Sequence, residues 1–259
     1  MFDRLQKPFL TVETGEAYQP IRLTFDLLRP DLLPQILAEI KCIQKNTTTN
    51  AWTWYWKEEC EDLHFDSIDS FRKNPDHPVR LGTISMREGK VFINLPSFKR
   101  GCLAVPFFYR LVKKDIMVVH SADFINKVFA LDERLPHGFS ELFKEEELER
   151  IMNERISDYD SVKERCEKAA TPEEAFKVLS DYTNTEAKKR LPYAERYLFD
   201  LSANIEDVEV VFLAFYIYLR GRELVAIKRW FGQTGYTLAD AVHESVHQVF
   251  GDMGMDIIE

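Results

Sequence analysis

Two segments near the start of the chain alternate apolar and polar side chains, which is the pattern of a half-buried strand. Residues 20–26 do so at a period of two. In the second segment Trp52, Trp54 and Trp56 alternate with Thr and Tyr, and only a strand gathers three such indoles on one face. That face is either a wall of the core or a binding platform. Because strands with one apolar face usually turn it inward, we expect the indoles to be buried.

A β-hairpin is predicted next. The apolar segments 79–86 and 91–95 flank a turn at residues 87–90, in which Gly89 can supply a positive φ. A further short strand is expected at 115–120, followed by a helix at 122–130.

Apolar residues three and four positions apart predict helices. One is expected at 31–43 with Asp31 as its cap, and another from Ser97 to Leu111. A long charged helix is expected from Glu141 to Lys168. The sequence Thr171-Pro172-Glu173-Glu174 is a capping box that starts the helix after it.

The remaining elements follow from weaker patterns. A helix is expected at 192–201, and a last one at 237–250 that stops at Gly251. Residues 207–219 and 223–231 are rich in β-branched and aromatic side chains, so they predict a two-stranded hairpin. Periodicity alone leaves a buried helix open as the alternative.

These elements predict an α+β fold with a mixed β-sheet in the N-terminal part. The second part is expected to be rich in helices, with a β-hairpin and a C-terminal helix. Residues 131–138 contain Pro136 and Gly138 and are the best linker, so we divide the chain into domains at 1–135 and 136–259.

The charge composition of the chain argues against some classes of binding partner. The chain has 259 residues, with 34 basic and 43 acidic side chains and a net charge of −9. This charge repels phosphate backbones and anionic lipid, so we expect neither nucleic acid nor membrane as a partner. The longest uncharged apolar run, Val210 to Leu219, is about half of the roughly 20 residues that a membrane-spanning helix needs.

The expected compartment is the cytoplasm. The first eight residues lack the apolar core of a secretory signal. The cysteines at positions 42, 60, 102 and 166 are scattered, which is typical of free thiols in a reducing environment.

One short motif carries candidate chemistry. The segment His243-Glu244-Ser245-Val246-His247 has the pattern H-E-x-x-H, with two imidazoles one helical turn apart. Over 238–251 the chain resembles the zinc-dependent metallopeptidases, which implies His243 and His247 as zinc ligands and Glu244 as general base. Ser245 departs from the bulky apolar residue of that family. The candidate third ligands downstream are Asp252, Asp256 and Glu259. The alternative, which we favour, is that both histidines are ordinary residues of a terminal helix.

Three further patterns have simpler structural explanations. Residues 100–106, around Cys102, resemble the cysteine-ligand motif of peptide deformylases, but a small apolar residue in a helix explains Cys102. Glu88 and Lys90 resemble part of the PD-(D/E)xK nuclease pattern, yet they flank Gly89 within the predicted turn. His64 lies among aspartates that match no ligand spacing, as in a solvated loop.

No family is recognised over the whole chain. The leading hypothesis is a soluble intracellular binding or regulatory protein, without a cofactor or catalysis of its own, that acts through protein–protein contacts. An aromatic surface and the acidic helix at 141–168 would make those contacts. The alternative hypothesis is a zinc-dependent hydrolase that uses His243, Glu244 and His247.

Overall fold

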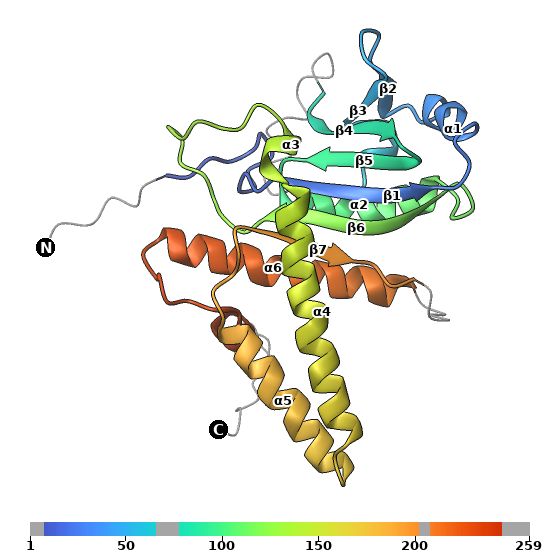
Figure 1. The fold of residues 1–259 in the computed structure, drawn as a ribbon. Helices are drawn as coiled ribbons and strands as arrows, with labels where there is room; N and C mark the ends of the chain where they lie inside the picture. The colour runs from blue at the N-terminus through green and yellow to red at the C-terminus, as the bar shows by residue number, and fades with distance from the viewer. Residues whose placement is uncertain (1–7, 66–77, 202–207, 245–259) are drawn as a thin grey trace, which may run out of the picture.

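The protein is built on a seven-stranded sheet, seen face-on in Figure 1. The computed structural model describes residues 8–65, 78–201 and 208–244. The strand order is β2-β3-β4-β5-β1-β6-β7. In chain order the strands are β1 (Ile21–Leu27), β2 (Ile43–Lys45), β3 (Ala51–Tyr55), β4 (Arg80–Arg87), β5 (Lys90–Leu95), β6 (Met117–Ile125) and β7 (Ala194–Leu198).

The first helices lie between strands along the chain, and α3, α4 and α5 then follow one another without a strand between them. They are α1 (Leu33–Glu39), the single 3₁₀ turn η1 (Glu58–Cys60), α2 (Phe98–Leu111), α3 (Phe139–Leu142), α4 (Glu145–Glu167), α5 (Pro172–Lys188) and α6 (Val208–Trp230). Residues 238–244 are also helical. This confirms the α+β class. The sheet was expected to be mixed, but every described strand pairing is antiparallel. The central strand β1 lies between β5 and β6 and runs antiparallel to both.

The predicted strand with three indoles is β3, and it forms a wall of the core. Trp54 is fully buried and Trp52 nearly so, while Trp56, just beyond the strand, is half-buried. The ring of Trp54 lies 5.0 and 5.2 Å from the ring centres of Phe107 and Phe108 on α2. The prediction of burial is therefore confirmed for the first two tryptophans, and α2 is the helix that covers Trp54.

Several local predictions are confirmed. The hairpin is β4 and β5, with Glu88 and Gly89 at positive φ in its turn. Ser97 caps α2 by accepting a hydrogen bond from the backbone N–H of Arg100. Thr171 caps α5 in the same way, through the N–H of Glu174.

Residues 208–230 are one helix, so the predicted hairpin at 207–231 is wrong. The buried positions Phe215, Leu219, Arg222 and Ala226 recur at steps of four and three, which is a helical stripe. Phe215 and Leu219 belong to the main core, where α6 packs beside α2, whereas Ala226 belongs to a smaller cluster with Ala17 and Val128. High β-propensity is overridden here because burial against α2 selects a helix.

Other boundaries were also wrong. No helix forms at 192–201; the segment contains the strand β7, which pairs with β6 and has Ala194 and Glu195 buried. No helix forms at 122–130, because β6 continues to Ile125 and residues 126–130 are not helical. The helix expected at 31–43 ends at Glu39, after which Ile43 opens β2.

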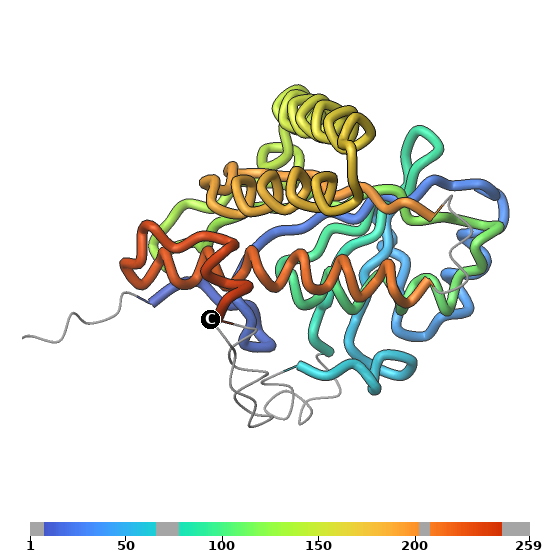
Figure 2. The backbone as a smooth tube through the Cα atoms, turned by 90° about the horizontal axis from the view of Figure 1, so that it is seen from below, coloured from blue at the N-terminus to red at the C-terminus, as the bar shows by residue number. Residues whose placement is uncertain are grey.

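The two faces of the sheet are covered differently. In Figure 2, α4 lies above the strands and α6 below them. The helices α2 and α6 pack on the face that carries the indoles, whereas Phe139 and Phe143, at the start and just after α3, approach Arg22 on the opposite face. Residues from both sides of the predicted boundary at 135 share this sheet and core. The division into two domains stays a prediction.

Candidate functional site

The H-E-x-x-H segment lies only partly within the described residues. His243 and Glu244 belong to the short helix at 238–244, whereas His247 and the downstream acids Asp252, Asp256 and Glu259 lie outside the described ranges, as does Gly251. Glu244 accepts hydrogen bonds from Lys228 Nζ at 2.7 and 2.8 Å and from the Tyr236 hydroxyl at 2.7 Å. The bonds from Lys228, and then from Tyr236, lower the pKa of Glu244.

Glu244 therefore ties the helix at 238–244 to α6 through Lys228. Over residues 8–65, 78–201 and 208–244, no group of three or more His, Cys, Asp or Glu side chains is arranged to hold a metal ion. Because His247 is not described, the assignment of His243 and His247 as ligands stays a prediction.

The other sequence candidates lie in ordinary structural positions. Cys102 is buried in α2, and burial raises the pKa of its thiol to about 12. Glu88 lies in the hairpin turn, and Lys90 is 3.9 Å from Asp26 on the adjacent strand. His64 is exposed, and two of the aspartates near it in sequence lie outside the described residues.

A buried ion cluster, missed by the sequence analysis, joins α4 and α6 to the sheet edge. Glu195 on β7 is fully buried and accepts a hydrogen bond from Arg222 Nε of α6 at 2.8 Å. Arg155 of α4 and Asn126 also donate to its carboxylate. Burial opposes ionisation of Glu195, but the arginines Arg222 and Arg155 outweigh it and lower its pKa.

The neighbouring residue on β7 anchors the start of α4. Arg196 donates to both carboxylate oxygens of Asp123 on β6, at 2.6 and 2.9 Å. It also donates to both oxygens of Glu145, at 2.5 and 2.9 Å. The first acidic residue of α4 is therefore engaged with the sheet.

Beyond this anchor, α4 and α5 form a helical hairpin that extends away from the sheet, which we call the helical arm (Figure 1). No residue of α5 is fully buried, and α4 has only three buried side chains along 23 residues. Phe176 of α5 has 73% of its surface exposed. Its neighbour Leu179, and Ile156 and Tyr159 of α4, are exposed as well.

The helical arm is also strongly acidic. The helix α4 has nine acidic and four basic side chains, and α5 has four acidic and two basic ones, which gives a net charge of −7. The arm thus carries most of the formal charge of −9 of the chain. It combines exposed apolar side chains with negative charge, and it is the leading candidate for a binding surface.

Comparisons with known proteins add nothing to this geometry: no family model, no curated protein and no solved structure matches the chain. Among the described helices, none has the length and apolar character required to cross a membrane.

Proposed function

We propose that this chain is an intracellular binding protein without catalysis of its own, and that it acts through protein–protein contacts made by the helical arm. The partner is a protein that presents apolar side chains within a basic surface. The proposal includes a cytoplasmic location, which the four unpaired cysteines support.

The observation that carries the proposal is the lack of burial in α5. Helices in proteins gain most of their stability from packing an apolar face, and α5 has no fully buried residue over 17 positions. Phe176 and Leu179 lie three residues apart, on the same side of α5, and both are exposed. A partner that covers them would bury apolar area that the chain alone leaves in water.

The test compares two variants of the purified, immobilised chain in quantitative capture from a lysate. The first combines Phe176→Ser and Leu179→Ser on the arm. The matched control is Leu131→Ser, which changes another exposed apolar residue outside the arm. Thermal unfolding of each variant checks that the fold is retained.

We expect partners bound by the wild type to be lost from the arm variant and kept by the control. Recovery of the same partners, in the same amounts, by a folded arm variant would contradict the proposal. Among the described residues, no observation favours the zinc-hydrolase hypothesis.

A further inference from the structure

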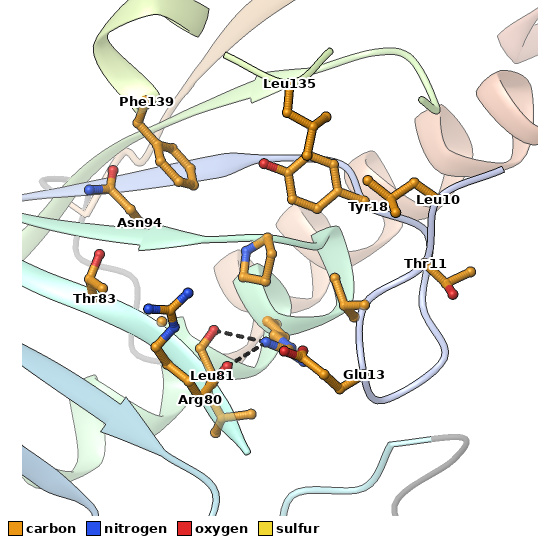
Figure 3. Close-up of a pocket in the computed structure, with 14 residues that line it drawn as sticks. Leu10, Thr11, Glu13, Tyr18, Arg80, Leu81, Thr83, Asn94, Leu135 and Phe139 are labelled. Carbon is orange, nitrogen blue, oxygen red and sulfur yellow. Dashed lines mark hydrogen bonds and ion pairs between the residues drawn. The ribbon is translucent and has the colours of Figure 1, made fainter. Parts of the chain in front are cut away.

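A cavity of about 620 Å³ lies at one end of β4 and β5, and its lining includes Arg100 of α2 (Figure 3). Its walls come from four parts of the chain: residues 10–18, the first half of β4, residues 94–100, and residues 135–139. Its volume is in the range of small-ligand sites. The helical arm contributes no residue to it.

The floor of the cavity is held rigidly by Arg100 of α2, whose side chain is fully buried. Its guanidinium donates to the carbonyls of Arg80 and Leu81, at 2.8 and 3.3 Å, and to the Thr14 hydroxyl at 2.8 Å. Glu13 and Glu16 lie 3.4 and 3.5 Å from it and balance its charge. Arg100 therefore fixes the start of β4 through Nη1 and holds Thr14 through Nη2, while its Nε makes only the ion-pair contact with Glu16 and no hydrogen bond to a described residue.

Three donors gather on the strand side of the cavity. Thr83 and Asn94 are paired across β4 and β5, so their side chains share one face of the sheet. Asn94 Oδ1 accepts a hydrogen bond from Arg22 at 2.9 Å, which leaves the amide NH₂ group as a donor. Arg80 lies on the same side (Figure 3), and no hydrogen bond or ion pair joins its side chain to a described residue.

The opposite wall is largely apolar. It is formed by Leu10, Tyr18, Leu135 and Phe139. Burial raises the pKa of Tyr18, so its hydroxyl is neutral at pH 7. Glu13, the acidic residue that lines the cavity, lies beside Arg100, on the other side from the three donors (Figure 3).

We propose that this cavity binds a carboxylate attached to an aromatic or branched apolar group. The carboxylate pairs with Arg80 and accepts hydrogen bonds from Thr83 and Asn94. The apolar group lies against Leu135 and Phe139. Glu13 repels an anion at the other end, so the ligand has one orientation. Either a free organic acid or the C-terminal residue of a peptide presents this chemistry.

The test is a titration of the full chain followed by heteronuclear NMR. The probes are 3-phenylpropionate and its uncharged amide, and acetyl-glycyl-phenylalanine with a free or an amidated C-terminus. The variants are Arg80→Gln and, as the matched control, Arg110→Gln, an exposed arginine near the end of α2. A thermal unfolding curve checks that each variant is folded.

We expect saturable binding of at least one acid, with shifts confined to residues around the cavity. Binding weakens roughly tenfold in Arg80→Gln and for the matching amide, and stays unchanged in Arg110→Gln. Binding of the free acid alone identifies a small-molecule site, whereas tighter binding of the peptide identifies a C-terminal residue as the ligand. Equal binding of acid and amide, an unaffected Arg80→Gln, or no saturation of any probe up to about 10 mM would overturn the proposal.

Discussion

At the residue scale, Trp54 joins the sheet to its covering helix. Its indole N–H donates to Cys60 Sγ at 2.9 Å, and its ring contacts Phe107 and Phe108. We expect Trp54→Ala to lower the free energy of unfolding by about 3 to 5 kcal/mol, because it leaves a cavity in the core. Urea denaturation measures this. Tyr55→Ala, on the other face of β3, is the control and should cost clearly less; equal losses would show that Trp54 is not a core residue.

Glu195 provides a prediction that depends on pH. Glu195→Gln keeps the shape of the side chain but leaves Arg222 and Arg155 without a countercharge, so we expect a loss of about 3 to 5 kcal/mol at pH 7. The pKa of Glu195 in the folded state is lowered. Its stabilising contribution is therefore complete above the unfolded pKa of about 4.3 and disappears as the pH falls through the folded value.

Denaturation of both proteins at a series of pH values measures this contribution. The difference in unfolding free energy between wild type and Glu195→Gln should be constant near neutrality and shrink below about pH 4. A difference that stays the same in acid would mean that the ionised carboxylate does not hold the cluster together.

Residues differ in how well the sequence predicts their roles. The caps Ser97 and Thr171 and the alternation around Trp54 depend on neighbours within a few positions, so they are visible in the sequence. The cluster at Glu195 joins residues 40 and 27 positions apart on three elements. No local sequence pattern predicts this cluster. The prediction of a helix at 192–201 also gave no reason to expect Glu195 on a strand beside α4 and α6.

At the element scale, α6 explains why one prediction failed. Its first half is almost uniformly apolar, so periodicity could not separate a helix from two strands. Gly221 favoured a turn there because glycine is common in turns. In the structure Gly221 lies in the interior of α6, and a Cβ added to it would meet only the tip of Leu238, at 3.4 Å.

We therefore expect Gly221→Ala to stabilise the protein by about 0.5 to 1 kcal/mol, because alanine loses less backbone entropy in a helix. The control is Gly89→Ala, at φ +71° in the hairpin turn, which should destabilise. Chemical denaturation of both variants measures whether each substitution raises or lowers the free energy of unfolding. Destabilisation by Gly221→Ala would argue against a continuous helix at this position.

At the scale of the whole molecule, the candidate sites draw on distant segments. The cavity brings together residues 10–18, β4, β5, α2 and residues 135–139. The sequence predicts several of these elements, but it does not predict that they lie together. Their neighbours depend on the order of strands in the whole sheet, in which β1 lies between β5 and β6. The acidic helix, in contrast, could be predicted as a candidate surface, because its charge and length are local properties.

The helical arm is attached to the sheet at one end, through Glu145 and Arg196. A test of the arm's negative charge therefore has to avoid the residues at that end. Glu145 holds Arg196, so reversing its charge would disturb the sheet as well as any partner. Acids at the far end of the arm avoid this problem. Asp160, Glu167 and Glu173 are exposed there, and within the described residues their side chains make no hydrogen bond or ion pair.

We expect replacement of Asp160, Glu167 and Glu173 by Lys to reduce capture of the partners that the wild type binds. Capture by the wild type should itself weaken between about 50 and 300 mM salt, since exposed charges are screened beyond about 8 Å at physiological ionic strength. The control replaces Glu39, Glu61 and Asp62 by Lys, which changes the net charge equally at exposed sites outside the arm. If both triple variants lose the same partners, net charge and not the arm determines binding; if neither does, the acidic surface only stabilises and solvates the helices.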